Sequence, residues 1–458
     1  MAKSYSEITP EIHSLADKSK KNNGITPEMY AEKNVKRGLR DKDGNGVVAG
    51  LTEISTIISK KKNDDGTTEP CCGELYYRGI DIKALTDGFL SEERFGFEEA
   101  VYLLLFSELP TKSELEEFKE IIAGYRSLPP SFVRDMILKA PSKDMMNALS
   151  RSVLALYSYD ENPDDISIDN VLRQSLQLIS IFPLLAVYGY QGYRHYHLNK
   201  SLHIRNPKPY LSTAENLLHI LRKDGKFTPL EAKVLDLALV LHAEHGGGNN
   251  SSFTTHVVTS SGTDTYSAFA AALCSLKGPR HGGANIKVVQ MFDNIKKNVD
   301  ITDKSAIKDY LVKILDKEAF DKSGLIYGMG HAVYSISDPR ADVLKKCAKD
   351  LSLEKGCTAE FELYEQVAEL ATQIIAEKRK IYKGVSPNVD FYSGLVYKML
   401  NLPLELFTSI FAVSRIAGWS AHRIEEIENA GKIIRPAYLG VKPKRKYTPL
   451  DERSAQKQ

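Results

Sequence analysis

T-P-L-E-A-K-V-L-D-L-A-L-V-L-H-A-E-H-G-G-G-N (228–249) has the start and stop signals of one complete helix. Thr228 and Glu231 have the spacing of a capping box, and Pro229 stands at the first helical position. The apolar run that follows continues the helix until the glycines end it. We therefore expect a helix that carries His242 and His245 at its C-terminal end.

The same helical periodicity dominates the chain on both sides of this stretch. Apolar residues recur at helical spacing in 97–106, 265–276, 361–380 and 403–428. Alternating β-branched, aromatic and polar residues predict short strands at 46–55 and 74–82. The polar segment 60–69 is expected to be a surface loop and 441–458 a charged tail that frays. The chain is therefore predicted to be mainly α, with a small β contribution near its N-terminus.

The composition is that of an ordinary globular enzyme. The 458 residues are enough for more than one domain, and 61 Lys and Arg against 59 Asp and Glu give a net charge of +2. No global charge therefore points to nucleic acid. The five cysteines lack the spacing of metal ligands, and their odd number fits a reducing compartment. The N-terminus has neither signal-peptide nor transit-peptide character, so a cytoplasmic location is expected.

One charge-free stretch, 174–193, is long enough to raise the question of a membrane span. It contains several glutamines, two glycines and a proline, which the hydrocarbon core of a bilayer would penalise. A helix buried inside the protein is the expected structure.

Two patterns suggest metal ions, and neither is complete. His242 and His245 lie at H-x-x-H spacing, whereas metalloprotease helices place their histidines at i and i+4, and no third ligand is apparent. D-K-D-G-N-G (41–46) matches the first half of a calcium loop, but Thr52 stands where the final glutamate should be. We expect no metal. His242 fits a core histidine as well as a functional one, whereas His245, beside the glycines and Asn249, is expected to face an anion.

Three further segments carry the residue types that move protons near neutral pH. His281 lies in G-P-R-H-G-G-A-N (278–285), His331 in G-M-G-H-A-V-Y (328–334) and Asp390 in S-P-N-V-D-F-Y-S-G (386–394). His281 precedes a helix that should start near Ala284, and the helix dipole there favours a neutral ring that can polarise a carbonyl oxygen. Together these residues predict an active site built from segments that converge in space.

Three arginines are candidate partners for substrate carboxylates. Arg340 lies in D-P-R (338–340), Arg415 in the apolar helix expected at 407–419, and Arg435 in I-I-R-P-A-Y (433–438). An unpaired buried charge is costly, so Arg415 should pair either with a buried carboxylate of the chain or with a substrate carboxylate. Three guanidiniums imply a substrate with more than one carboxylate.

These segments, in this order, resemble the citrate synthase family. The matching motifs are L-H-A-E-H-G-G-G-N, G-P-R-H-G-G-A-N, G-M-G-H-A with D-P-R, P-N-V-D-F-Y-S-G, A-V-S-R-I-A-G-W and R-P-A-Y-L-G. The resemblance runs over about 50–440. Two departures are K-D-M-M (143–146), where the family often has His-Pro-Met, and the extra length ahead of Val47 and in 60–69. Neither departure changes the motifs quoted above.

The resemblance implies a helical homodimer in which a small domain (282–389) closes over a large domain (1–281 and 390–458). It implies that Asp390 removes a methyl proton from acetyl-CoA, that His281 polarises the thioester carbonyl, and that His331 assists attack on oxaloacetate. Oxaloacetate binding is assigned to His245, Asn249, Arg340, Arg415 and, across the dimer interface, Arg435. CoA binding is assigned to Arg40, Ala284, Gly328, Gly330, Ala332, Lys383 and Asn388. The resemblance implies no cofactor besides the substrate acetyl-CoA, and no nucleic-acid or membrane partner.

Two alternatives stay open at this point. 2-Methylcitrate synthases use propionyl-CoA, and one methylene in an apolar pocket is worth only about 1–3 kcal/mol, so the motifs do not separate the two substrates. A non-catalytic protein that binds dicarboxylates or CoA is the other alternative, but such a protein has no need of Asp390 together with His281 and His331.

Overall fold

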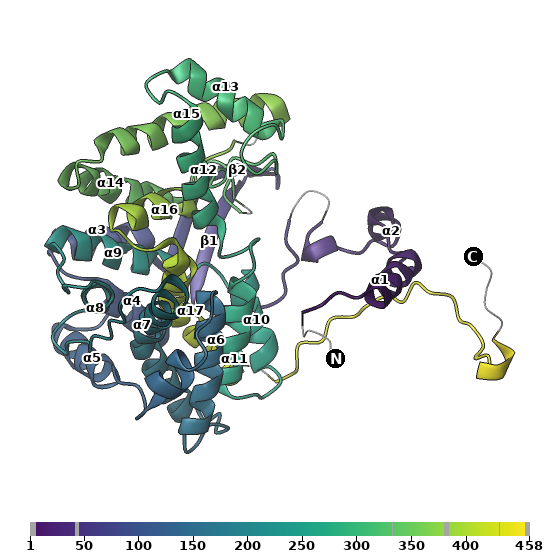
Figure 1. The fold of residues 1–458 in the computed structure, drawn as a ribbon, viewed down its shortest axis with the longest axis horizontal. Helices are drawn as coiled ribbons and strands as arrows, with labels where there is room; N and C mark the ends of the chain where they lie inside the picture. Colours follow the sequence, from purple (N-terminus) through teal and green to yellow (C-terminus); the bar gives the residue numbers. More distant parts are fainter. Residues whose placement is uncertain (1–5, 42–44, 332, 380–383, 430, 454–458) are drawn as a thin grey trace. The chain divides into compact units, whose positions relative to one another are not determined.

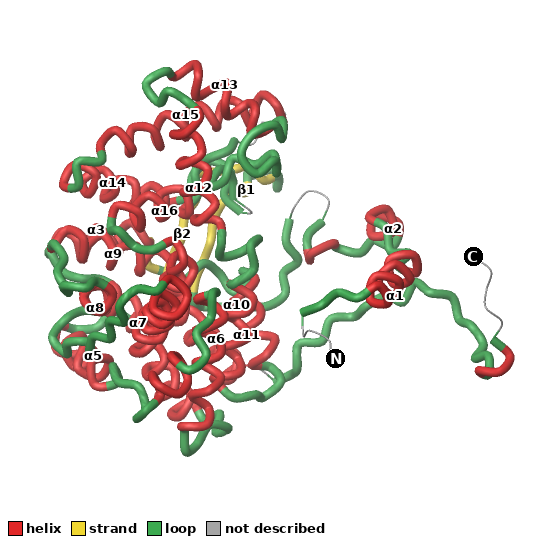
Figure 2. The backbone as a smooth tube through the Cα atoms, viewed as in Figure 1, coloured by secondary structure: helices red, strands yellow, loops and turns green. Residues whose placement is uncertain are grey.

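The computed structural model describes residues 6–41, 45–331, 333–379, 384–429 and 431–453. These residues form two compact units, Met1–Gly50 with Arg435–Gln458, and Leu51–Ile434. Helices dominate the larger unit (Figures 1 and 2), so the mainly α prediction is confirmed. The smaller unit contains α1 (Pro10–Asn22), α2 (Pro27–Glu32) and the short turns η1 (Arg37–Leu39) and η5 (Leu450–Glu452).

The larger unit carries all the remaining elements. Its α-helices are α3 (Ile82–Ser91), α4 (Phe97–Phe106), α5 (Lys112–Gly124), α6 (Met145–Leu156), α7 (Ile168–Leu198), α8 (Thr213–Leu221), α9 (Pro229–His242), α10 (Asn250–Thr259), α11 (Thr265–Leu276), α12 (Ala284–Asn298), α13 (Lys304–Leu315), α14 (Pro339–Glu354), α15 (Thr358–Arg379), α16 (Val389–Met399) and α17 (Phe407–Asn429). Short helical turns are η2 (Val133–Leu138), η3 (Tyr157–Tyr159) and η4 (Leu404–Leu406).

The helices predicted from periodicity are present. Segments 97–106 and 265–276 coincide with α4 and α11 at both ends. At the start of α9 the Thr228 hydroxyl accepts from the backbone N–H of Glu231, and the Glu231 carboxylate accepts from that of Thr228, so the capping box is formed. The chain then turns at Gly246, whose φ of +82° is a left-handed value that glycine adopts without strain.

A three-stranded antiparallel sheet is formed by β1 (Ser55–Lys62), β2 (Thr68–Tyr77) and β3 (Ile80–Asp81), in that spatial order. The strand signal at 74–82 is confirmed as the end of β2, a hairpin and β3. Arg78 and Gly79, which join these strands, both have positive φ (47° and 83°), as a tight two-residue hairpin requires.

Two predictions near this sheet are wrong. Segment 46–55 is not a strand: among its described residues Gly46 makes one isolated bridge, to Arg40, and β1 begins only at Ser55. Its apolar residues Val48 and Leu51 are exposed, so the alternating pattern has no core to face. Segment 60–69 is not wholly a loop, because Lys60–Lys62 pair with Thr68–Pro70. The polar side chains there mark an exposed strand end rather than an absence of pairing.

The core of the larger unit forms around two long helices, α7 and α17, which pack against each other. Within the described residues α7 is the one helix long and apolar enough to cross a membrane, and 83% of its apolar window is buried inside the protein. The expectation of a buried helix at 174–193 is therefore confirmed. Helix α17 also packs against α9, α10 and α11, and buries Arg415 and Trp419.

Helices α13, α14 and α15 lie together at one end of the larger unit (Figure 1). All three belong to the segment 282–389 that is expected to move as a small domain. Helix α16 connects this end with the rest of the unit, because it packs against α14, α12 and α9. Closure of 282–389 over the remainder stays a prediction.

Candidate active site

The small sheet holds the loop between α9 and α10. Ser55 and Tyr77, paired across β1 and β2, both contact this loop. The Ser55 hydroxyl donates to the Glu244 carboxylate (2.9 Å) and accepts from the N–H of Gly246 (3.1 Å). The Tyr77 hydroxyl accepts from the N–H of Glu244 (3.1 Å) and lies 3.0 Å from its carbonyl oxygen. The loop that presents His245 and Asn249 is thus fixed at both main chain and side chain.

His245 is buried at the end of this loop. Its ring centroid lies 5.1 Å from that of His331 and 5.4 Å from that of Tyr334, both edge to face. Burial first, and then the positive charge of Arg340, hold the pKa of His245 well below its usual value, so the ring is neutral at pH 7. Nε2 has no hydrogen-bond partner among the described residues. This nitrogen is available to an oxygen atom of a ligand.

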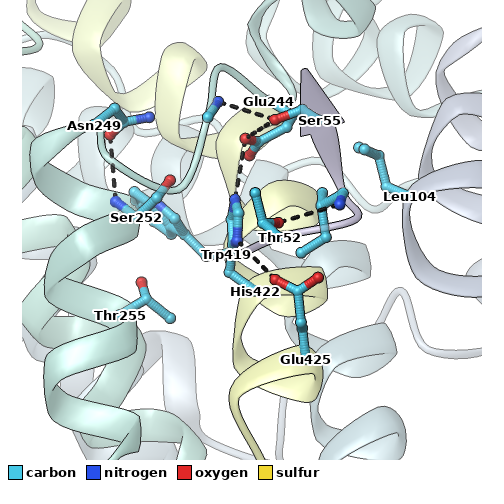
Figure 3. Close-up of polar contacts among 12 residues, drawn as sticks. Thr52, Ser55, Leu104, Glu244, Asn249, Ser252, Thr255, Trp419, His422 and Glu425 are labelled. Atoms are coloured by element: carbon cyan, nitrogen blue, oxygen red, sulfur yellow. Dashed lines mark hydrogen bonds and ion pairs between the residues drawn. The ribbon is translucent and has the colours of Figure 1, made fainter. Parts of the chain in front are cut away.

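Asn249 caps α10 and keeps one polar group unused. Its Oδ1 accepts from the N–H groups of Ser251 (3.1 Å) and Ser252 (3.3 Å), as Figure 3 shows for Ser252. Its Nδ2 is buried and has no hydrogen-bond partner among the described residues. The side chain therefore offers the N–H donor that the sequence predicts for binding an anion.

His242 is a core histidine. Its Nδ1 donates to the carbonyl oxygen of Ala238 (2.8 Å), and its ring packs against Phe411 at 4.6 Å. Burial lowers its pKa to about 3. Of the two histidines in the H-x-x-H pattern, His245 is the one whose ring packs against His331, whereas the ring of His242 packs in the core against Phe411.

His281 lies in the break between α11 and α12, as expected. Its Nε2 is 3.1 Å from the hydroxyl of Ser251, which also lies 3.2 Å from the indole Nε1 of Trp419. Burial, followed by the charge of Arg415, lowers the pKa of His281 to about 4. The ring is therefore neutral at pH 7, as expected, and the contribution of the dipole of α12 stays a prediction. The Ser251 hydroxyl also lies 3.0 Å from Oδ1 of Asn249, which accepts from it, so the ring proton of His281 resides on Nδ1 only when Ser251 donates to Nε2 instead.

Backbone hydrogen bonds join the His331 turn to the segment that leads into Asp390. The N–H of Gly330 donates to the carbonyl oxygen of Ser386 (2.8 Å), and the N–H of Asn388 donates to that of Gly328 (2.9 Å). The side-chain Nδ2 of Asn388 adds a bond to the carbonyl oxygen of Gly330 (2.7 Å). These bonds fix His331 relative to the start of α16, although the two segments are far apart in sequence.

The orientation of His331 follows from its own backbone. Its Nδ1 accepts from the N–H groups of Val333 (3.1 Å) and Tyr334 (3.2 Å). A neutral ring must therefore carry its proton on Nε2. The Tyr334 ring stacks on the imidazole with centroids 5.0 Å apart, and its hydroxyl donates to the carbonyl oxygen of Glu74 in β2 (3.2 Å).

Asp390 stands in the first turn of α16. Its N–H donates to the side chain of Asn388, the N-cap residue (3.0 Å). Asp390 keeps a small exposed face, but burial of its carboxyl among protein atoms raises the pKa to about 6, against the opposing effect of Arg340. At pH 7 the group is mostly ionised, and it is a stronger base than an ordinary aspartate.

Arg340 and Arg415 differ in how they are paired. Arg340 donates from Nε and Nη2 to the two carboxylate oxygens of Asp338 (3.0 and 2.8 Å), so its predicted role as a bidentate clamp is restricted to the N–H groups that remain. Arg415 donates from Nε to the carbonyl oxygen of His242 (2.6 Å) and lies over the Phe411 ring. No carboxylate of the described residues lies within ion-pair distance of Arg415, although the charge of Glu244 favours its cationic form, so its remaining N–H groups can bind a ligand carboxylate.

The charge of Arg415 connects the predicted residues. It lowers the pKa values of His281, His245 and Asp390 together. Residues from α17, the α9–α10 loop, the α11–α12 break and α16 therefore lie within electrostatic range of one guanidinium. With Arg340 nearby, two guanidiniums and two neutral imidazoles supply N–H donors that suit the carboxylates of a dianion.

Four predicted binding residues are not placed at this site. Arg40 and Arg435 belong to the smaller unit. Ala332 and Lys383 lie outside the described residues. Ala284 is the first residue of α12, and Gly328 and Gly330 form the turn before His331 with φ of 81° and 84°. The assignment of CoA contacts to these residues stays a prediction.

One cluster resembles a metal site at first sight. Ligand atoms of His256, His422 and Glu425 lie within 4.8 Å of one another. However, the facing nitrogens of the two histidines are hydrogen-bonded directly at 3.1 Å, so a proton occupies the space between them. We assign no metal to this cluster.

Sequence reasoning missed Ser251, Tyr334 and Asp338. Asp338 could have been found, because Asp before Pro-Arg is an N-cap signal, and its side chain does accept from the N–H of Arg340 (3.0 Å). The contacts of Ser251 with His281, and of Tyr334 with His331, depend on the tertiary arrangement. No local sequence pattern predicts these two contacts.

Comparisons with known proteins agree with this geometry. The family model described as citrate synthase, C-terminal domain, matches residues 43–437. Citrate synthase 2 of Bacillus subtilis is 34% identical over 89% of this chain and 98% of its own, and 2-methylcitrate synthase 1 of Corynebacterium glutamicum is 30% identical over 93% and 100%. A solved ternary complex of carboxymethyl coenzyme A and oxaloacetate with citrate synthase from Thermoplasma acidophilum is 28% identical, with a TM-score of 0.74 over 91% of this chain and 98% of that one.

A second solved structure, citrate synthase from Pyrobaculum aerophilum, is 30% identical, with a TM-score of 0.72 over 89% of this chain and 94% of that one. The similarity therefore extends through the site segments as well as the fold. The chain belongs to the citrate synthase family.

Proposed function

We propose that this protein condenses acetyl-CoA with oxaloacetate and hydrolyses the resulting citryl-CoA to citrate and CoA. The observation that carries the proposal is that neutral His281, His245 and the carboxyl of Asp390 all lie within electrostatic range of Arg415, with His331 against His245. The solved relative that holds a CoA analogue and oxaloacetate supports the two substrates.

Asp390 acts as the base. A thioester methyl group is a very weak carbon acid, so the base needs both a raised pKa and help from stabilisation of the enol oxygen. The pKa of Asp390, raised to about 6 by burial, supplies the first requirement without protonating the group at pH 7.

His281 supplies the second requirement. As a neutral ring with its proton on Nδ1 it donates a hydrogen bond to the thioester oxygen. This role requires the Ser251 hydroxyl to donate to Nε2 of His281 (3.1 Å) rather than to Oδ1 of Asn249 (3.0 Å). The enol carbon then attacks the keto carbon of oxaloacetate. His331, with its proton on Nε2, donates to the oxygen that gains negative charge.

Oxaloacetate is held by groups on both sides of the predicted hinge. His245, Asn249 and Arg415 belong to the segments assigned to the large domain, and Arg340 to 282–389. A dicarboxylate bridging them would draw the domains together, exclude bulk water and leave one water to hydrolyse the citryl thioester.

A free-thiol release assay tests this function. Purified protein should release CoA from acetyl-CoA only when oxaloacetate is present, and propionyl-CoA should react more slowly. Faster reaction with propionyl-CoA would instead assign 2-methylcitrate synthesis, the activity named for relatives of 30% and 31% identity. Oxaloacetate-independent thiol release would contradict both activities.

We further propose a homodimer in which Arg435 completes the oxaloacetate site of the partner subunit. Its place in the R-P-A-Y motif supports this arrangement. Co-expressed Arg435→Leu and Asp390→Asn subunits should regain activity in the mixed dimer, because one of its two sites would carry both native residues. Mixed dimers without any regained activity would place Arg435 in its own subunit's site or outside both.

A further inference from the structure

A chain of hydrogen bonds leads away from the loop that carries His245. Glu244, the residue before His245, accepts from Nε2 of His422 (3.0 Å). Nδ1 of His422 faces Nε2 of His256 (3.1 Å), and Nδ1 of His256 faces the Glu426 carboxylate (2.7 Å). Glu244 and His422 are each 0% exposed. Figure 3 shows His422 between Glu244 and Glu425.

The geometry fixes the number of protons in this chain. An ionised carboxylate only accepts, so Nε2 of His422 and Nδ1 of His256 must both carry hydrogen. The contact between the two rings needs one more proton, because two bare nitrogens would place their lone pairs face to face. Two neutral rings hold two protons in total, and this chain holds three. One ring is therefore an imidazolium.

The imidazolium is His422. Although burial opposes it, the charge of Glu244 and the hydrogen bond to it raise the pKa of His422 to about 9. Burial and the charge of His422 lower the pKa of His256. The Glu244 carboxylate is in turn held ionised, its pKa lowered by His422 and Arg415 against the effect of burial.

Other charged groups facing His422 act in the same direction. Glu425, on the same helix, has a carboxylate oxygen 3.9 Å from Nδ1 of His422 and accepts from the N–H of Glu53 (2.8 Å). The charge of Glu425 also raises the pKa of His256, against burial and the charge of His422. The surroundings of the two rings thus favour a cation.

We propose that Glu244, His422, His256 and Glu426 are positioning residues that hold the loop of His245 and Asn249 in its oxaloacetate-binding conformation. The inference rests on the proposed function, because it takes these two residues as oxaloacetate ligands. The Glu244 side chain connects the two histidines to the loop. Its carboxylate accepts hydrogen bonds from His422 and Ser55, and His245 is the next residue in the chain.

Loss of one proton disrupts the hydrogen bonds that join Glu244, His422, His256 and Glu426. When His422 becomes neutral, one of the three hydrogen bonds must be given up, and Glu244 loses its cationic partner. The KM for oxaloacetate should therefore rise as pH increases through about 9. The kcat at saturating oxaloacetate should change less than the KM, since His331 and Asp390 are held by the turn bonded to Asn388 and bound oxaloacetate restores the loop.

Two matched variants test the proposal. Glu426→Gln keeps an acceptor for Nδ1 of His256 but removes its charge, so the imidazolium becomes less stable. The pH at which the oxaloacetate KM rises should move down by about one unit, the low end of what one nearby charge does to a pKa. Glu428→Gln removes the same charge from an exposed position of the same helix, and its pH profile should match that of the unchanged protein.

Two further measurements do not depend on turnover. Calorimetry measures the affinity for oxaloacetate, and 15N NMR of labelled histidines measures the protonation of their rings. The unchanged protein should show one imidazolium that persists to about pH 9, and this signal should be lost at lower pH in Glu426→Gln. Identical KM and affinity profiles in both variants, or a flat profile through pH 10 in folded protein, would overturn the inference. A KM rise abolished by chelators would also overturn it, because an ion would then occupy the site. Absence of citrate formation with the expected binding profile would instead reject the proposed function alone.

Discussion

Asp390 combines two properties that oppose each other in water: it is ionised at pH 7, and its conjugate acid is weaker than that of an ordinary aspartic acid. Burial disfavours the charged form, whereas Arg340 and Arg415 favour it, and the balance leaves the pKa at about 6. The charge of Arg415 also lowers the pKa of His281. The same guanidinium therefore favours the charged form of Asp390 and the uncharged form of the His281 ring. One buried cation thus adjusts both the base and the hydrogen-bond donor.

This balance predicts the acid limb of the pH–rate profile. The base is active only when ionised, so kcat/KM should fall as pH decreases through about 6, where the Asp390 carboxyl becomes protonated. His281, with a pKa of about 4, stays neutral throughout this range and should add no second inflection. Thiol-release rates at limiting acetyl-CoA from pH 4.5 to 8 measure this limb. A limb near pH 4 would mean that Asp390 is not the base or is not buried in the active conformation.

At the scale of elements, helix starts and strand ends place the reacting groups. The N-cap of α16 orients Asp390, the N-cap of α10 orients Asn249, and the paired ends of β1 and β2 hold the loop of His245. The side chain of Asn388 joins two site segments. Its Oδ1 caps α16, and its Nδ2 donates to the carbonyl oxygen of Gly330.

Asn388→Ala should therefore affect both stability and catalysis. Loss of an N-cap costs about 0.5–2 kcal/mol of the free energy of unfolding. Loss of the bond to Gly330 should also loosen His331 relative to Asp390 and lower kcat at saturating substrates.

Asp303→Ala is the matched control, because Asp303 caps α13 through Ser305 and Ala306 and contacts none of the predicted site residues. Urea unfolding should show a loss of stability in both variants, and thiol release a loss of kcat in Asn388→Ala alone. Equal kcat values in the two variants would show that the Asn388–Gly330 bond does not position the catalytic groups.

The elements that could be predicted from the sequence are those whose pattern is local. Helix α9 has its capping box and its terminal glycine, and α4 and α11 show uninterrupted periodicity. The ends of β1 could not be predicted, because pairing of exposed polar residues at Lys60–Lys62 leaves no alternation to detect. The same distinction holds at the site. His281 and Asp390 stand in recognisable motifs, whereas the bond between Arg340 and Asp338 and the support of His281 by Ser251 form only in the folded chain.

At the scale of the whole molecule, the account requires the two substrates to assist each other's binding. Arg340 lies in 282–389 and Arg415 and His245 outside it, so a dicarboxylate bound to all three should favour closure. Closure would bring the turn at Gly328 and Gly330, with its predicted CoA contacts, over the site. Coupling of this kind typically amounts to about 1–3 kcal/mol and must be reciprocal.

Calorimetry should therefore show acetyl-CoA, or a non-reactive analogue of it, binding about 5–150-fold more tightly when oxaloacetate is saturating. Oxaloacetate should bind more tightly by the same factor when the CoA ligand is saturating. An acetyl-CoA affinity that is indifferent to oxaloacetate would contradict closure of 282–389 over the substrates.

The central claim is that Asp390, His281 and His331 together turn the methyl carbon of acetyl-CoA into a nucleophile toward oxaloacetate. NMR of a reaction with acetyl-CoA labelled with 13C at its methyl group follows that carbon directly. The account predicts that the label moves from the thioester methyl group to a methylene group of citrate, with one thiol released per citrate. Asp390→Asn should reduce this rate by about 10²–10⁴-fold while oxaloacetate binding is retained. A label that stays in acetyl-CoA with the unchanged protein, or equal rates in Asp390→Asn, would contradict the account.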